Sequence, residues 1–302
     1  MDIAGAWLDG VLVDITSARV SAFGRGALFG DGVFKVVCVR NGVPFRLANH
    51  LDRLETSADL LAMNARPHRG EFQREAELAC ASVARHDRAH LKLVLTRAGT
   101  LGVDPPLDEI MTRDSPGATR LVFARAYAVA PESERAVREG VRVMTSRFRA
   151  SAVPGAKSLS YAGSIVARIA ARRASADEAL ALDDNDNVIE GATSNVCAIM
   201  RGARGPVLVA PVAGALRGVT RACVLSLARD RNMAIEERPL SVVELRAARE
   251  AFITSTMRGV WGVGYVDNAR IGGAAPTPAP GPTTSALAVA YEQLVARECR
   301  GF

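Results

Sequence analysis

The sequence has 302 residues, of which 49% are hydrophobic, and this length holds one large or two medium domains with a buried core. Its net charge of +6 comes from arginines scattered among acidic residues, so we expect a solvated basic surface and no nucleic-acid partner. No apolar stretch approaches the roughly 20 residues of a membrane span and no signal peptide is visible, so we expect no membrane partner.

The first half of the chain shows alternating strand and helix patterns. The β-branched run 32–40 ends at the turn signal Asn41-Gly42, which predicts a hairpin with its return arm at 43–47. Apolar residues at helical spacing predict a helix at 50–63. A second helix is expected at 71–85, and strands at 90–96 and 120–129 are separated by a loop over 98–118.

A polar, proline-containing segment at 130–134 lies between two strand-like runs and predicts a linker. Beyond it we expect strands at 141–146, 178–182, 195–200 and 250–254, helices at 162–174, 220–230 and 285–297, a turn at 183–187 and a loop at 274–282. The pattern therefore predicts an α/β chain with a small N-terminal domain, 1–130, and a larger C-terminal domain, 131–302.

Cysteine and histidine usage bears on compartment and chemistry. The five cysteines are odd in number and unclustered, which favours buried thiols in a reducing cytoplasm. The four histidines show no metal-ligand spacing. We therefore expect a cytoplasmic protein without a metal site.

Only three of the 38 basic residues are lysines: Lys35, Lys92 and Lys157. Arginine cannot replace lysine where a primary amine must lose its proton and attack a carbonyl. Lys157 lies in a turn-like segment just before a predicted helix, a position that suits an imine with an aldehyde cofactor. A genome rich in G and C would also favour arginine and leave three lysines by chance, so lysine scarcity alone leaves both interpretations open.

Two later segments carry groups that suit such a cofactor. Glu190 is followed by small polar residues, and a carboxylate there could keep a pyridine nitrogen protonated. The segment 216–221 leads into the predicted helix at Thr220, whose N-terminus could bind phosphate, with Arg53 as a bidentate cation. Each has a plainer alternative: a glutamate at the end of a strand, a threonine N-cap, and a surface ion pair of Arg53 with Asp52 or Glu55.

Together these features describe a pyridoxal phosphate site, and the chain resembles the class IV aminotransferases, also called fold-type IV pyridoxal phosphate enzymes. This family includes branched-chain and D-amino acid aminotransferases and 4-amino-4-deoxychorismate lyase. The resemblance rests on six motifs in the family's order: Phe29-Gly30-Asp31-Gly32-Val33-Phe34, His50-Leu51-Asp52-Arg53-Leu54, Lys157-Ser158-Leu159, Glu190-Gly191 with Ser194-Asn195, Gly218-Val219-Thr220-Arg221, and Thr254-Ser255-Thr256.

The resemblance implies a two-domain fold with pyridoxal 5'-phosphate between the domains, a homodimer, and roles for matching residues. Lys157 would bond to the cofactor and carry the proton transfer, and Glu190 would pair with the pyridine nitrogen. Arg53, Thr256 and the amides of Val219 and Thr220 would hold the phosphate. The remaining implied cofactor-binding residues are Tyr161, at the cofactor's phenolic oxygen, Ser194, Asn195, Leu216 and Ser255. Tyr161 could instead be a plain aromatic on a helix face.

Departures from the family pattern bear on the substrate. Lys35 stands where family members commonly carry an acidic residue, and it either faces away from Phe34 or adds an amine to the pocket. The Arg-x-His carboxylate trap that follows the Thr-Arg-Gly strand end in D-amino acid aminotransferases is absent, and the loop 101–106 is similar to that of branched-chain enzymes. The residues expected near the substrate are Phe34, the amide of Met257, and Arg97 or Lys92 as helpers.

The favoured function is an aminotransferase that moves an amino group between an amino acid, of branched-chain or D-amino acid type, and a 2-oxo acid. The alternatives are a lyase that releases pyruvate and 4-aminobenzoate from aminodeoxychorismate, and a binding protein that keeps the fold without catalysis. Lys157 and Glu190 argue against the last.

Overall fold

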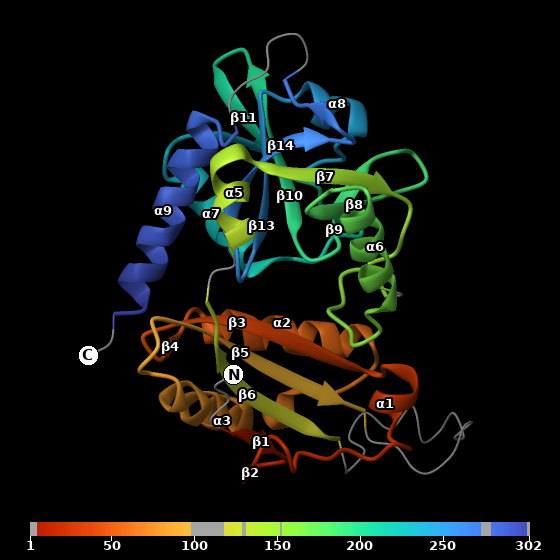
Figure 1. Cartoon of the computed structure of the whole chain (residues 1–302), viewed down its shortest axis with the longest axis vertical. Coiled ribbons are helices and arrows are strands. Elements are labelled where there is room, and N and C mark those ends of the chain that lie inside the picture. Colours follow the sequence, from red (N-terminus) through yellow and green to blue (C-terminus); the bar gives the residue numbers. More distant parts are fainter. Residues whose placement is uncertain (1–4, 98–117, 129–130, 152, 273–278, 301–302) are drawn as a thin grey trace. The chain divides into compact units, whose positions relative to one another are not determined.

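The computed structural model describes residues 5–97, 118–128, 131–151, 153–272 and 279–300 (Figure 1). The chain divides into two compact units. Unit 1 comprises Met1–Ala128, Gly155–Tyr161 and Val295–Phe302, and unit 2 comprises Val129–Pro154 and Ala162–Leu294. The first break lies close to the expected boundary at 130, but two later segments, including the one that carries Lys157, belong to unit 1. None of the described helices is long and apolar enough to cross a membrane.

Unit 1 is built on a six-stranded antiparallel sheet with the order β2-β1-β6-β5-β3-β4. Its elements are β1 (Ala6–Leu8), β2 (Val11–Val13), α1 (Arg25–Phe29), β3 (Gly32–Arg40), β4 (Val43–Pro44), α2 (Leu47–Leu60), the 3-10 helix η1 (Arg66–His68), α3 (Arg69–Ser82), β5 (Arg88–Thr96) and β6 (Arg120–Ala126).

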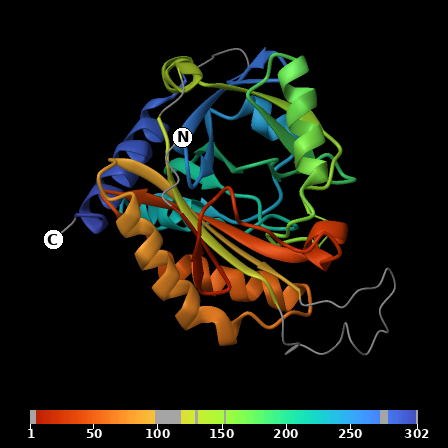
Figure 2. The ribbon, with the colours of Figure 1, turned by 60° about the horizontal axis from the view of Figure 1, so that its bottom comes forward.

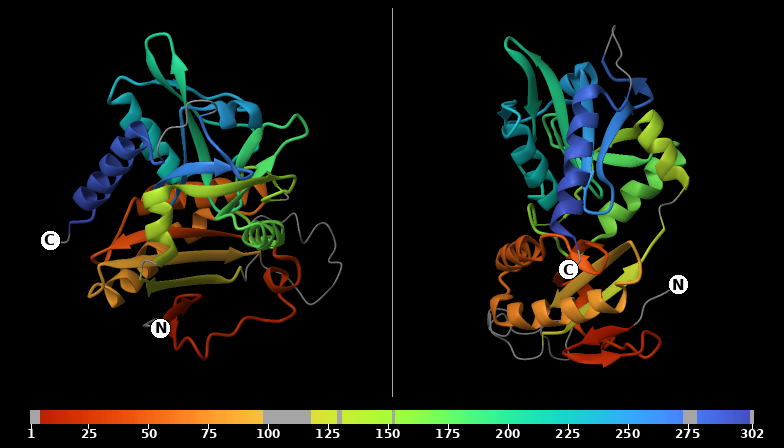
Figure 3. Two further views of the ribbon diagram at one scale, coloured as in Figure 1. Left: turned by 45° about the horizontal axis from the view of Figure 1, so that its top comes forward. Right: turned by 90° about the vertical axis from the view of Figure 1, so that its left-hand side faces the viewer.

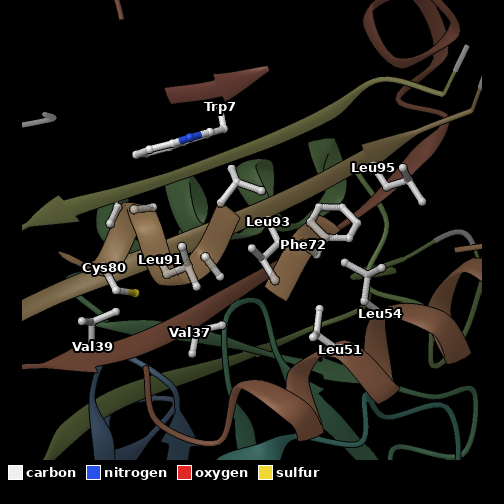
Figure 4. Close-up of a cluster of buried hydrophobic side chains, with 14 of the residues drawn as sticks. Trp7, Val37, Val39, Leu51, Leu54, Phe72, Cys80, Leu91, Leu93 and Leu95 are labelled. Carbon is white, nitrogen blue, oxygen red and sulfur yellow. The ribbon is translucent and has the colours of Figure 1, made fainter. Parts of the chain in front are cut away.

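Helices α2 and α3 pack on one face of this sheet, as Figure 2 shows, and form the core of unit 1 with it. Alternate residues of β3 and β5, among them Val37, Leu91 and Leu93, point into this core against Leu54 and Phe72 of the helices (Figure 4). The period-2 pattern of β3 therefore decides which of its side chains enter the core.

The predicted hairpin is confirmed, with a short return arm. Asn41 and Gly42 both have positive φ, 50° and 77°, as a two-residue hairpin turn requires. The strand β4 ends at Pro44, which has no N–H for the ladder, and α2 begins at Leu47. The predicted arm to residue 47 is therefore three residues too long.

Unit 2 is built on a nine-stranded mixed sheet with the order β12-β11-β10-β13-β14-β7-β8-β9, and β15 pairs with β14. Its elements are α5 (Pro131–Glu139), β7 (Val141–Ser146), α6 (Ala162–Arg173), β8 (Glu178–Leu182), β9 (Val188–Gly191), β10 (Asn195–Gly202), β11 (Gly205–Val209), α7 (Val219–Arg229), β12 (Ala234–Glu236), α8 (Val242–Ala247), β13 (Glu250–Ser255), β14 (Gly259–Val266), β15 (Ala269–Arg270) and α9 (Pro282–Glu298). Figure 3 shows its β10–β11 hairpin in teal.

The predicted linker at 130–134 is wrong where the structure describes it, because α5 begins at Pro131. Proline suits the first position of a helix, because its missing N–H has no partner there in any case. The polar composition is thus that of an amphipathic helix. Most of the predicted loop at 98–118, and residues 274–278 of the other, lie outside the described residues.

Candidate functional site

The main chain of Lys157 is held on both sides. Its carbonyl accepts a hydrogen bond from the N–H of Phe34 at 3.0 Å, and its own N–H donates to the Ser57 hydroxyl at 3.2 Å. Leu159 donates to the carbonyl of Gly32 at 2.9 Å, so residues 157–159 run beside the start of β3. A Cβ on Gly32 would lie 2.8 Å from a methyl carbon of Leu159 and 2.5 Å from the Leu95 carbonyl oxygen, so this close approach requires glycine.

The amine of Lys157 lies among aromatic rings. Nζ is 4.6 Å from the ring centre of Phe34 and 5.9 Å from that of Tyr161, and the two rings meet edge to face at 5.6 Å. Lys92 brings a second amine to 5.3 Å from the Phe34 ring centre, and burial lowers its pKa. Unit 1 thus brings together Phe34, Lys92, Lys157 and Tyr161, four of the residues expected at the site.

A group of basic side chains lies behind Lys157, on the core side of β3. Lys35 is fully buried, and the pKa of its amine is held well below its usual 10.5 by burial first, then by the charges of Arg53 and Lys157. His50 is also buried, and burial followed by the charges of Arg53, Lys35 and Lys157 holds its pKa well below 6.5. Four basic groups that influence one another, Lys35, His50, Arg53 and Lys157, thus form a basic cluster.

The two carboxylates considered from the sequence as surface partners of Arg53 both bind Arg69, Asp52 at 2.8 Å and Glu55 at 2.7 Å. The charge of Arg53 acts on the buried Lys35 and His50. Its placement in the basic cluster fits a cation that holds phosphate.

Arg97 is bound by protein groups. Its Nε donates to Asp31 at 2.9 Å, and its two terminal nitrogens donate to the carbonyls of Ala62 and Leu61 after α2. Its side chain is 10% exposed. These contacts tie the end of α2 to the start of β3. A role for Arg97 at the substrate stays a prediction.

In unit 2, Glu190 near the end of β9 is held by groups from two other segments. Its carboxylate accepts from the N–H of Leu216 at 3.0 Å and from the side-chain amide of Asn195 at 3.5 Å. Asn195 also donates to the Leu216 carbonyl at 2.7 Å. These bonds fix the direction of the carboxylate, as a partner for a protonated ring nitrogen requires.

Helix α7 begins next to this group. Gly218 is its N-cap, and no side chain caps the first N–H groups of Val219 and Thr220. A Cβ on Gly218 would lie 2.0 Å from the side-chain oxygen of Asn195, so only glycine fits. Thr220 is the second residue of the helix and so is not its N-cap, and its hydroxyl lies 3.3 Å from that of Tyr291. An uncapped helix N-terminus of this kind suits phosphate.

Glu178, which the sequence did not indicate, connects the turn that follows Thr254-Ser255-Thr256 with Ser194 of the expected Ser194-Asn195 motif. This fully buried carboxylate accepts from Thr193 at 2.6 Å, Ser194 at 3.2 Å and Arg258 at 2.9 Å. Arg258 in turn donates its N–H to the Ser255 hydroxyl at 3.3 Å. The half-buried Thr256 and Met257 lie in this turn. No local pattern marks Glu178, because it acts through residues distant in sequence.

The residues of each unit fit pyridoxal phosphate by chemical type. Unit 1 supplies a lysine amine beside aromatic rings and an arginine in the basic cluster. Unit 2 supplies an oriented carboxylate and a glycine-capped helix N-terminus.

Comparison with known proteins bears on the same interpretation. The sequence matches the family described as amino-transferase class IV over residues 32–265. A putative branched-chain-amino-acid aminotransferase of Methanocaldococcus jannaschii is 35% identical over 268 residues, which cover 86% of this chain and 87% of that protein. A D-alanine aminotransferase of Listeria monocytogenes is 29% identical over 290 residues, 95% of either chain.

Solved structures of branched-chain aminotransferases match the fold of this chain. A T.th. branched-chain amino acid aminotransferase with pyridoxamine 5'-phosphate matches with a TM-score of 0.81 at 27% identity, over 99% of this chain and 96% of that one. The branched-chain enzyme of Escherichia coli matches with a TM-score of 0.82 at 25% identity, over 99% and 97% of the two chains. The expected family and fold class are confirmed, and these relatives favour transamination over the lyase alternative.

Proposed function

The chain belongs to the class IV aminotransferase family and is an aminotransferase, and we propose that it uses pyridoxal 5'-phosphate to move an amino group from an amino acid to a 2-oxo acid. The observation that carries the cofactor proposal is the setting of Lys157. A scarce lysine has its main chain pinned to β3 and Ser57 while its amine lies over the Phe34 ring. A lysine that supplies only positive charge to a surface does not require its main chain to be fixed by hydrogen bonds on both sides.

Pyridoxal phosphate, when bound, would hold the substrate amine covalently and withdraw electrons from its Cα. Lys157 would take the proton from the substrate Cα and deliver it to C4′ of the cofactor. Phe34 and Tyr161 restrict where the amine can lie, and the Tyr161 hydroxyl would bond the cofactor's phenolic oxygen. A positioned amine of this kind lowers the barrier to proton transfer.

Glu190 would keep a proton on the pyridine nitrogen. Its carboxylate is already oriented by Leu216 and Asn195, so little reorganisation is needed on binding. Arg53, the amides of Val219 and Thr220, and Thr256 would hold the phosphate, with Ser194 and Ser255 positioned by the Glu178 network.

We propose a branched-chain type of amino acid as donor. Phe34 and Tyr161 offer apolar contact, and the amide of Met257 with Lys92 would bind the substrate carboxylate. Arg97, held at Asp31 and at the carbonyls after α2, stays a second candidate helper for the carboxylate. The relatives named as branched-chain enzymes support this choice, and the D-alanine enzyme keeps D-amino acids as a second candidate.

We also propose a homodimer in the cytoplasm. All five cysteines are buried and none forms a disulfide, which supports a reducing compartment. Sedimentation equilibrium at several protein concentrations would test the dimer.

The deciding experiment adds single amino acids to the enzyme loaded with cofactor. L-valine, L-leucine and L-isoleucine should each convert the cofactor's spectrum to that of pyridoxamine phosphate, and a 2-oxo acid should reverse the change, as two half-reactions at one site require. D-alanine tests the second candidate. If no amino acid changes the spectrum while aminodeoxychorismate is cleaved to pyruvate, the lyase alternative replaces this proposal.

A further inference from the structure

Ser57 on α2 is a junction of three hydrogen bonds. Its hydroxyl donates to the carbonyl of Arg53 at 2.8 Å and accepts from the amine of Lys35 at 2.7 Å and from the main-chain N–H of Lys157 at 3.2 Å. A serine hydroxyl has one donor and two acceptor sites, so all its bonding capacity is in use. Lys35 and Lys157 therefore share one oxygen atom.

Lys35 is placed for this contact by the alternation of β3. Val33 and Val37 enter the core, and Lys35 between them points the same way, whereas Phe34 lies on the opposite face. Long basic side chains usually run along apolar surface until the charged end reaches water. The Lys35 amine instead ends inside the core at Ser57, with no exposed surface.

An ion pair does not account for this burial. The charged groups that act on Lys35 are Arg53 on α2 and Lys157, and the nearby titratable group on α2 is His50, which is itself affected by Lys35. No described acidic residue appears among these influences. A buried amine among cations costs stability, and such a cost is commonly retained where a residue serves a functional site.

We propose that Lys35 is a positioning residue for Lys157, acting through the Ser57 hydroxyl. By occupying one acceptor site of Ser57, Lys35 directs the other toward the Lys157 N–H and so fixes the main chain from which the reactive amine extends. Burial and the adjacent cations favour the uncharged amine, which still donates this hydrogen bond. The inference rests on the proposed function only in taking Lys157 as the cofactor-binding lysine.

The scarcity of lysine gives a clean measurement. Protein labelled with [15N]lysine has three labelled main-chain amides, and each signal is assigned by its loss in a Lys→Met variant. Hydrogen exchange is measured on the cofactor-free protein, so the result does not depend on catalysis. In Lys35→Met the Lys157 amide should exchange about tenfold faster, the size expected for one weakened hydrogen bond, while the Lys92 amide in β5 is unchanged.

Lys92→Met is the matched control, because it removes the other lysine amine of this sheet, which lies over the Phe34 ring on the face opposite Lys35 and Ser57. It should leave exchange at Lys157 unaltered. Ser57→Ala should also speed exchange at Lys157, and adding Lys35→Met to Ser57→Ala should have no further effect, because the route through the hydroxyl is already lost.

Three results would overturn the proposal. Exchange at Lys157 within twofold of wild type in Lys35→Met would show that Lys35 does not position it. Equal acceleration at Lys92 would show general loosening, and hence a structural role alone. A further acceleration by Lys35→Met in the Ser57→Ala background would show a route that bypasses Ser57. Failure of the protein to bind pyridoxal phosphate would contradict the proposed function, but the exchange rates of the cofactor-free protein would still test this inference.

Discussion

Arg258 Nη1 lies 2.9 Å from Oε2 of Glu178, a carboxylate with no exposed surface, whereas Arg258 itself is 23% exposed. The same oxygen accepts from Thr193 and Ser194. One carboxylate thus joins the turn after β13 to the segment that leads into β10. Both segments carry motifs of the proposed cofactor site.

Breaking the Arg258–Glu178 ion pair should lower the free energy of unfolding by more than the partial exposure of Arg258 suggests. Arg258→Met would leave the Glu178 charge buried without a cation, and we expect unfolding free energy to fall by about 3 kcal/mol in urea denaturation. Glu178→Gln in the Arg258→Met background should restore part of the loss, because an amide carries no charge. As a control, Arg147→Met breaks the exposed pair with Asp186 and should cost less than about 1 kcal/mol. Equal losses at the two arginines would mean that Glu178 is reached by water.

The cofactor's visible absorbance should depend on Lys157 alone among the lysines. We expect the reconstituted protein to be yellow and Lys157→Ala to lack the lysine-linked band, because neither of the other amines can replace it from its position. Lys92→Ala, which removes the other amine near Phe34, should keep the band. A colourless wild-type protein after incubation with pyridoxal phosphate would contradict the assignment.

Much of this arrangement follows from local patterns in the sequence. The alternation of β3 and the Asn41-Gly42 turn each depend on a few neighbouring residues, and the scarcity of lysine is a simple count over the sequence, so these parts could be predicted. The Ser57 junction and the Glu178 network could not, because each joins side chains separated by tens of residues, and neither Ser57 nor Glu178 differs from a surface residue in its local sequence. Helix α5 was missed because its polar first turn has the composition of a linker.

Arg53→Ala should weaken cofactor binding more than it slows the reaction. Phosphate is remote from the bond that breaks, so Arg53 supplies binding that is equal in ground and transition states. Losing it should cost on the order of 2 kcal/mol, roughly 30-fold in the cofactor dissociation constant by fluorescence titration. Arg69→Ala is the control, because Arg69 binds Asp52 and Glu55 on the same helix. Unchanged affinity in Arg53→Ala would remove Arg53 from the phosphate site.

The buried basic cluster should make stability rise with pH. The folded-state pKa values of His50 and Lys35 lie below 6.5 and 10.5, so between each lowered value and the ordinary one the unfolded chain binds one more proton. Unfolding free energy should then increase with pH through each window, by at most about 1.4 kcal/mol per pH unit for each group. The Lys35→Met variant lacks the rise in unfolding free energy that Lys35 gives wild type at alkaline pH. From pH 7 to pH 10 the unfolding free energy of wild type should therefore increase relative to that of Lys35→Met. A difference that stays constant would show that Lys35 is charged in the folded protein.

Glu190→Gln should retain cofactor while it slows removal of the substrate Cα proton. Glutamine can still accept from the Leu216 N–H, so the local structure should survive. An amide cannot stabilise a positive pyridine nitrogen, and the developing negative charge at Cα then loses its electron sink. We expect a loss on the order of 100-fold in the exchange of the amino acid's Cα hydrogen with deuterium, at unchanged cofactor content. The exposed Glu236, paired with Arg238, provides a control, since Glu236→Gln should exchange at the wild-type rate. If Glu190→Gln also matches wild type, the carboxylate acts only as a structural partner of Leu216 and Asn195.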